Sequence, residues 1–232
     1  MKKKVISTKI YVFVLAVLFF TPSLNAQKNV DKETFRIETI PFELESVNNP
    51  LKVEIKNDSA IRLSSNGKTN LFNSPGDNYY RQNAPMLLFH PDSNFILRAK
   101  VTAELKEIYD VAALVVYQNN DLWAKLCFEN SIDKETTIVS VVTRRYSDDC
   151  NSINIPDNFA YLSIAKKGKE FSFYYSSDNI NWKLVRHFRL DCMENELMIG
   201  FTVHCSRGEM FSADFSDIEY TSDVLENMRR YK

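Results

Sequence analysis

Three short apolar runs between residues 109 and 149 constrain the fold of this chain more than any other feature. They read YDVAALVVYQNN (109–120), DLWAKLCFE (121–129) and TTIVSVVTRRYSDD (136–149), and polar residues separate them. Runs of this length that are rich in β-branched and aromatic residues and bounded by polar turns are typical of successive antiparallel strands. We therefore predict a three-stranded antiparallel unit in this stretch.

The middle run has two unlike faces, because side chains alternate along a strand. One face suits a hydrophobic core and carries Ala124, Leu126 and Phe128. The other face carries Trp123, Lys125, Cys127 and Glu129. An indole, an ammonium and a carboxylate in one row indicate a binding surface, so we expect the functional site beside this row.

The four cysteines do not fall into obvious pairs. A hairpin of 122–129 with 137–145 puts Cys127 opposite roughly Ile138 and not beside Cys150. The same reasoning separates Cys192 from Cys205. Four cysteines in an exported chain allow three pairings, among which the sequence does not choose. We favour free thiols.

The rest of the chain continues the strand pattern. Apolar runs recur about every 8–12 residues to a total of roughly a dozen, and LKVEIKN (51–57) alternates as a half-exposed strand does. No internal repeat and no Pro- or Ser-rich linker divides the sequence, so we predict one all-β domain over 27–232, a sandwich or jelly roll of two antiparallel sheets. The tail SDVLENMRRYK (222–232) is expected to form a short helix or to fray.

The first 26 residues have the pattern of a secretory signal peptide. Four lysines precede an apolar run from Ile10 to Phe20, and small residues follow up to Ala26, our preferred cleavage site. The apolar run is short for a membrane span, so we expect no span after cleavage and an exported protein, periplasmic or extracellular. Cleavage would lower Lys plus Arg from 29 to 25 against 30 Asp plus Glu, a net charge near −5. A chain without basic excess is not expected to bind nucleic acid.

Five segments in succession resemble one known family. They are NSPGDNYYRQNAPML (73–87), YDVAALVVYQNNDLWAKLCFE (109–129), VVTRRYSDD (141–149), FSFYYSSDNINWKLVR (171–186) and MFSADFSDIEY (210–220). Their order is similar to that of the regulator-of-enolase-type domain, a domain of unknown function related to the C-terminal domain of bacterial β-xylosidases. The resemblance covers about 60–220 and implies a concanavalin A-like jelly-roll β-sandwich. This fold is shared by lectins and glucanases, so it does not decide function.

Catalytic and metal motifs are weak in this sequence. A glycosidase needs two carboxylates about 5–10 Å apart, and no strand presents such a pair. A glycoside hydrolase that uses Glu129 remains an alternative, as does an envelope scaffold that binds a protein. The three histidines lack metal-ligand spacing, and we expect no cofactor. A structural calcium ion held by Asp77, Asp214 and backbone carbonyls is the one metal site left open.

Carbohydrate binding fits the residue types best. A sugar site needs an aromatic ring for the C–H face and polar groups for the hydroxyls. We predict a non-catalytic, lectin-like carbohydrate-binding domain with ligand contacts from Trp123, Lys125, Glu129 and Arg144. The loop around Asp77, Tyr79 and Tyr80 is expected to cover the site. Further expected members are Tyr146, Asp148 and His204.

Overall fold

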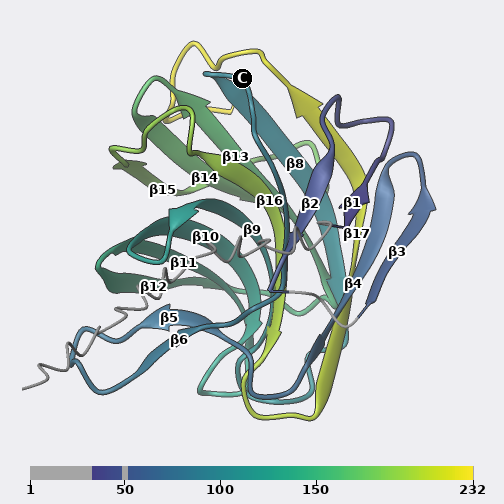
Figure 1. Cartoon of the computed structure of the whole chain (residues 1–232), viewed down its shortest axis with the longest axis vertical. Coiled ribbons are helices and arrows are strands. Elements are labelled where there is room, and N and C mark those ends of the chain that lie inside the picture. The colour runs from purple at the N-terminus through teal and green to yellow at the C-terminus, as the bar shows by residue number, and fades with distance from the viewer. Residues whose placement is uncertain (1–32, 49–51, 232) are drawn as a thin grey trace, which may run out of the picture. The chain divides into compact units, whose positions relative to one another are not determined.

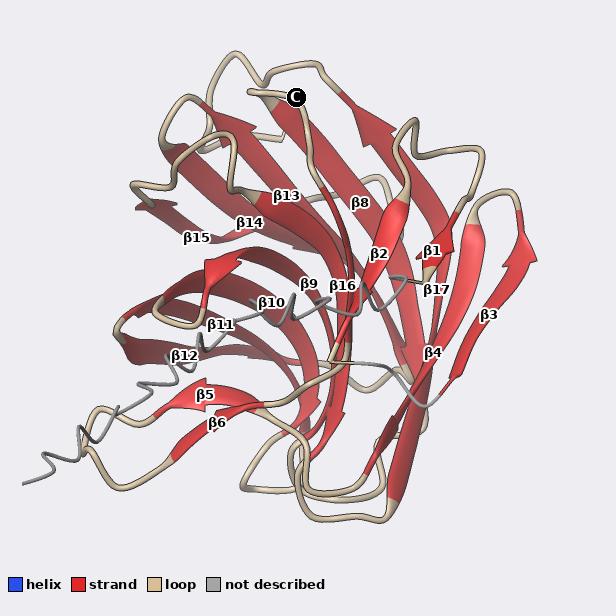
Figure 2. Ribbon diagram, in the orientation of Figure 1, coloured by secondary structure: helices blue, strands red, loops and turns tan. Residues whose placement is uncertain are grey.

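The computed structural model describes residues 33–48 and 52–231, and every regular element in that part of the chain is a β-strand (Figure 2). The strands form an eight-stranded sheet, a seven-stranded sheet and a separate two-stranded hairpin. All strand pairs within these sheets are antiparallel. The predicted two-sheet sandwich is therefore confirmed, with more strands than the dozen expected.

The eight-stranded sheet contains the unit predicted from the three apolar runs. In spatial order its strands are β1 (Thr34–Phe35), β2 (Leu44–Val47), β7 (Met86–Phe89), β16 (Met198–Cys205), β9 (Asp110–Asn119), β10 (Leu122–Asn130), β11 (Thr136–Arg144) and β12 (Tyr146–Asn154). Strands β9 to β12 are neighbours both in sequence and in space, as short turns favour. This half of the sheet curves strongly in Figure 1.

The seven-stranded sheet takes its strands from both ends of the described chain. In spatial order they are β15 (Lys183–Arg189), β14 (Glu170–Ser176), β13 (Phe159–Lys167), β8 (Phe95–Ala103), β17 (Met210–Thr221), β4 (Ala60–Asn66) and β3 (Lys52–Asn57). The remaining hairpin pairs β5 (Leu71–Asn73) with β6 (Tyr80–Gln82).

The main core lies between the two large sheets. Its largest fully buried side chains are phenylalanines from both sheets, and the rings of Phe201 in β16 and Phe215 in β17 lie 5.1 Å apart. The core face of β10 consists of Ala124, Leu126 and Phe128, as the alternation predicted. Burial of this apolar area is the main favourable term for the fold.

A second apolar cluster covers the other face of the eight-stranded sheet. Trp123 and Cys127 from β10 pack there with Val139 and Val141 from β11 and with Leu71 from the hairpin. The predicted alternation of β10 is thus correct, and Cys127 is part of a buried floor. Burial raises the pKa of its thiol to about 12, so it is an inert apolar group.

The β5–β6 hairpin lies under the curved half of the eight-stranded sheet (Figure 1). Asn73 holds it there: its side-chain amide donates to the carbonyls of Asn120 (3.0 Å) and Arg145 (2.9 Å), and its backbone N–H donates to Ser147 Oγ (2.9 Å). Asn73 is fully buried, so these bonds satisfy polar groups that would otherwise be costly. The hairpin is therefore a fixed wall of whatever space lies beneath it.

Two of the four edge strands of the large sheets, β3 and β12, are polar. In β3, Glu54 forms ion pairs with Lys52 (2.8 Å) and with Lys56. In β12, the residues from Asp148 to Ser152 are all exposed. The half-exposed strand predicted from LKVEIKN is confirmed by β3, which lies at the edge of its sheet.

Several finer expectations need correction. Cys127 pairs with Val139, not with Ile138, so the predicted register of the β10–β11 hairpin was off by one residue. The preference for free thiols, by contrast, is confirmed, because all four cysteines are free. The C-terminal tail forms no helix up to residue 231; instead Leu225 and Met228 pack on the outer face of the seven-stranded sheet beside Tyr174.

No helix among the described residues is long and apolar enough to cross a membrane. The predicted signal peptide, residues 1–26, lies outside the described residues.

Candidate functional site

A pocket of about 470 Å³ opens between the hairpin and the outer face of the eight-stranded sheet. Its apolar lining comes from Phe72, Val111, Val139 and Val141. Its ionisable lining comes from Lys125, Glu129, Asp149, His204 and Arg207. Tyrosines 79 and 109 and the small polar residues Asn70, Ser74 and Ser206 complete it. Pockets of this size and mixed character are typical of small-ligand sites.

Lys125 and His204 form a buried polar pair in this pocket. Lys125 is 2% exposed and His204 is 1% exposed, and Lys125 Nζ lies 3.1 Å from His204 Nε2. Lys125 also lies over the indole of Trp123, 5.7 Å from the ring centroid. The side chain can reach from β10 across to β16 because the intervening positions hold the small residues Ala113 and Cys127.

His204 is held in its neutral form. Burial and the neighbouring Lys125 charge keep the pKa of His204 well below its usual range. Its Nε2 therefore accepts a hydrogen bond from the Lys125 ammonium, which leaves the proton on Nδ1. That buried Nδ1 has no hydrogen-bond partner among the described residues.

Two carboxylates line the same pocket. Glu129 lies on the Lys125 face of β10, and Asp149 lies on β12, in line with Lys125 across Val141. The pKa of Glu129 is raised to about 7, chiefly by burial; the Lys125 charge opposes this shift and the Asp149 charge adds to it. A carboxyl group with this pKa can give or take a proton near neutral pH.

Tyr79, Tyr109 and Arg207 line the end of the pocket that is formed by loops. The guanidinium of Arg207 lies over the ring of Tyr109, 5.4 Å from its centroid. Tyr79 comes from the β5–β6 connection, and Asn70 Nδ2 donates to its hydroxyl at 3.4 Å. These groups offer ring faces together with hydrogen-bond donors and acceptors.

Because its pKa is raised, Glu129 makes the free energy of unfolding depend on pH, and Glu129→Gln should remove this dependence. The folded chain binds a proton on Glu129 more tightly than the unfolded chain does, so this group costs stability as pH rises from about 4.5 through 7. We expect Glu129→Gln to have little effect at pH 5 and to stabilise the protein by about 2–3 kcal/mol at pH 8. Urea unfolding followed by circular dichroism at both pH values measures this.

Glu226→Gln is the matched control for that comparison, because Glu226 is exposed on the C-terminal segment. Equal effects of the two substitutions at pH 8 would contradict a destabilising Glu129 carboxylate.

The structure brings four of the ten predicted site residues into the pocket: Tyr79, Lys125, Glu129 and His204. Trp123 lies beneath them with no exposed surface, and its indole N–H donates to the carbonyl of Asn120 at 3.2 Å. Trp123 was expected to contact a ligand, and the structure places it beneath the pocket and not in its lining. Its ring instead supports Lys125 from below.

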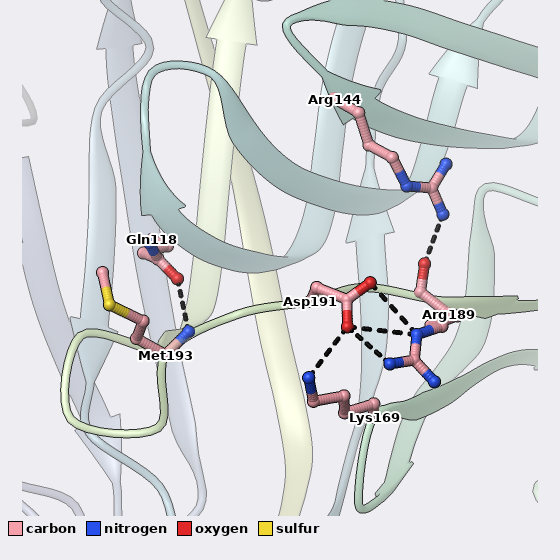
Figure 3. Close-up of polar contacts among 6 residues, drawn as sticks. All are labelled: Gln118, Arg144, Lys169, Arg189, Asp191 and Met193. Atoms are coloured by element: carbon pink, nitrogen blue, oxygen red, sulfur yellow. Dashed lines mark hydrogen bonds and ion pairs between the residues drawn. The ribbon is translucent and has the colours of Figure 1, made fainter.

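Arg144 and Asp148 were expected in the site and lie on the opposite face of the sheet. Arg144 donates to the backbone carbonyl of Arg189 in β15, which Figure 3 shows at the rim where the two large sheets meet. Asp148 forms an ion pair with Arg186 of β15 at 2.9 Å. Both residues connect one sheet to the other, and neither lines the pocket.

The remaining predicted residues form a cluster at the tip of the hairpin. Tyr80 donates a hydrogen bond to Asp77 Oδ1 at 2.6 Å, and the rings of Tyr80 and Tyr146 lie 6.4 Å apart. Hydrogen bonds from Tyr80 and Tyr146 hold the pKa of Asp77 below its usual range. Asp77, Tyr80 and Tyr146 do not line the pocket. Their contacts instead join the tip of the hairpin to β12, which helps to hold the hairpin over the pocket.

Sequence reasoning missed Asp149, Arg207, Tyr109 and Phe72. Asp149 could have been found from the alternation of side chains along the strand. With the observed registers of β10–β11 and β11–β12, it lies on the same face of the sheet as Lys125. The other three come from loops or from the short hairpin, where no periodicity points to a face.

The described residues contain no group of three or more His, Cys, Asp or Glu side chains that could hold a metal ion. The two carboxylates proposed for calcium lie apart: Asp77 binds Tyr80, and Asp214 in β17 pairs with Arg62 of β4.

Comparison with solved structures defines the class of fold. A functionally unknown protein from Saccharomyces cerevisiae superposes with a TM-score of 0.71 at 20% identity, over 78% of this chain and 97% of that one. A GH43 protein from Bacillus licheniformis gives 0.62 at 14% identity, over 80% of this chain and 38% of that one. The GH43B protein of a Bacteroides ovatus xyloglucan locus gives 0.63 at 15% identity, over 83% and 39%. This chain thus spans about two-fifths of the length of each GH43 protein, and these likenesses define a concanavalin A-like β-sandwich.

The sequence defines the family within that class. The model of the protein family of unknown function DUF1349 matches residues 47–223, about three-quarters of the chain, so the chain belongs to DUF1349. No curated protein matches it. The match includes every residue that lines the pocket.

Proposed function

We propose that this chain is an exported, non-catalytic carbohydrate-binding domain that seats an oligo- or polysaccharide in the pocket beneath the β5–β6 hairpin. The observation that carries the proposal is the composition of that pocket. Its rings, among them Phe72 and Tyr79, suit the apolar C–H faces of a sugar, and its charged groups, among them Lys125 and Asp149, suit hydroxyl edges. A fixed wall and a buried floor give such a site little to rearrange on binding.

The fold gives a second, weaker line of support. Domains of this fold form part of proteins named as GH43 glycoside hydrolases, and this occurrence supports a sugar ligand for the present chain. Export is part of the same proposal, and N-terminal sequencing of the mature protein would test it against the expected start at Gln27.

Truncation of Tyr79 to alanine should weaken sugar binding about tenfold, because the exposed ring supplies a stacking face at the pocket. Isothermal titration calorimetry against a panel of plant and host oligosaccharides measures this. Tyr161→Ala is the matched control, since Tyr161 lies on β13 in the other sheet and should leave affinity unchanged. If the wild-type protein gives no heat of binding with any oligosaccharide of the panel, the proposal is wrong.

A glycoside hydrolase that uses Glu129 is the second candidate. The raised pKa of Glu129, near 7, together with Asp149 in the same pocket favours it, because hydrolysis needs one carboxyl group protonated and one ionised. Release of reducing sugar that disappears in Glu129→Gln while binding persists would select the hydrolase. Binding without release selects the lectin-like domain.

A further inference from the structure

The Lys125 ammonium is a buried positive charge without a carboxylate partner. Among the described residues no Asp or Glu oxygen lies within 4.0 Å of its Nζ, and its one hydrogen-bonding partner is the neutral imidazole of His204. A buried charge is costly unless it is paired. An ammonium carries three donors, so His204 leaves two of them for another acceptor.

The protein fixes this ammonium in position. His204 Nε2 accepts from one side, the Trp123 ring lies behind, and the alkyl chain is enclosed in the second apolar cluster. Because Lys125 is 98% buried and yet lines the pocket, its free donors can only serve a ligand inside it. A charge that is already held in place gains more from an incoming anion than a mobile surface lysine does.

The carboxyl groups of the pocket do not neutralise Lys125. Glu129 lies four residues away on the same strand, and Asp149 lies two strands away. At neutral pH Glu129 is protonated in about half of the molecules, since burial raises its pKa to about 7. The deep end of the pocket therefore retains positive character, and Arg207 adds a second cation at the loop end.

We propose that the ligand of this pocket is an acidic sugar, a hexuronic acid unit whose carboxylate accepts hydrogen bonds from Lys125 Nζ. This rests on the proposed function, and it names the class of sugar. The pocket volume of about 470 Å³ and the rings of Phe72, Tyr79 and Tyr109 give room and stacking faces that an inorganic anion would leave unused.

Calorimetry with uronic acid oligomers and with the same oligomers after reduction of their carboxyl groups tests the proposal. The wild-type protein should bind the acidic oligomer at least about tenfold more tightly than the reduced one, because a charge-assisted hydrogen bond adds that much. Lys125→Met should abolish the preference, so that the variant binds the acidic and the reduced oligomer about equally. Circular dichroism of the variant confirms that it folds.

Lys166→Met is the matched control. Lys166 is also a buried lysine, but it lies on β13 in the other sheet and donates to the carbonyl of Ser93. Its removal should leave the preference for the acidic oligomer intact.

The outcomes separate the two proposals. Equal binding of acidic and reduced oligomers by the wild-type protein would overturn the acidic sugar and keep carbohydrate binding. Binding of neither would overturn both. Inorganic phosphate that competes as strongly as the uronic acid monomer would show an anion site with no sugar recognition, which also overturns the inference. The wild-type comparison decides even if Lys125→Met does not fold.

Discussion

Replacing Trp123 with alanine should lower the free energy of unfolding by about 3–5 kcal/mol, the cost typical of removing a large aromatic side chain from a core. Trp123 has no exposed surface, and it packs in the apolar cluster beneath the hairpin while its N–H satisfies the Asn120 carbonyl. The substitution leaves a cavity under Lys125, while the Asn120 carbonyl keeps the hydrogen bonds that it accepts from Asn73 and Gln82. Urea unfolding followed by far-ultraviolet circular dichroism measures the loss.

Trp182→Ala is the control for this prediction. Trp182 is half-buried and stacks on Tyr231, 4.5 Å between ring centroids, on the outer face of the seven-stranded sheet. Its loss should cost less than half as much. An equal or larger loss in Trp182→Ala would refute the central position assigned to Trp123.

Replacing Gly200 with valine should cost about 3–5 kcal/mol, from backbone strain together with a steric clash. Gly200 lies in β16 with φ of 156°, and a Cβ there would lie 2.1 Å from the backbone oxygen of Leu87 in β7. Strand β16 joins β7 to β9, so the clash falls inside the sheet and cannot be relieved by a side-chain movement. Thermal unfolding measures the effect.

Gly168→Ala separates the clash from the general cost of losing a glycine. Gly168 has φ of 57° in the turn between β13 and β14, and nothing lies within 4 Å of its Cβ position. We expect a loss of about 1 kcal/mol from left-handed strain alone. A loss in Gly200→Val no greater than this would contradict the close approach of β7.

The sandwich could be predicted because most strands carry their own signal. Alternation assigned the two faces of β10 correctly, and the alternating pattern of 51–57 indicated a half-exposed strand. Both inferences depend only on the two-residue period of a strand, which the sequence contains in full.

The site was harder to predict because it depends on register. Moving one strand by one residue along its partner turns every side chain to the other face. In the predicted register, Cys127 of β10 pairs with Ile138 of β11, and this pairing would place Arg144 on the pocket face of the sheet. In the structure Arg144 and Asp148 face the other sheet, and Asp149 takes the place beside Val141. No residue in the 130–135 turn indicated this one-residue difference in register.

The burial of Trp123 was unpredictable for a different reason. An aromatic ring in a row of polar side chains suggests an open surface, but the hairpin that covers this row comes from residues 71–82, far away in sequence. Only the tertiary hydrogen bonds of Asn73 bring it there. Single-strand patterns carry no information on such long-range cover.

The polar outer strands have a consequence for the protein in concentrated solution. A free strand edge offers unpaired N–H and C=O groups to a second copy of the chain, and this is a common start of aggregation. Two β3 strands that met antiparallel and centred on Glu54 would bring Lys52 of one copy opposite Lys56 of the other, and two β12 strands centred between Asp148 and Asp149 would bring these aspartates opposite each other. Like charges that face each other across strands repel. At these two of the four edges of the large sheets, such repulsion therefore disfavours the pairing of one sandwich with the next.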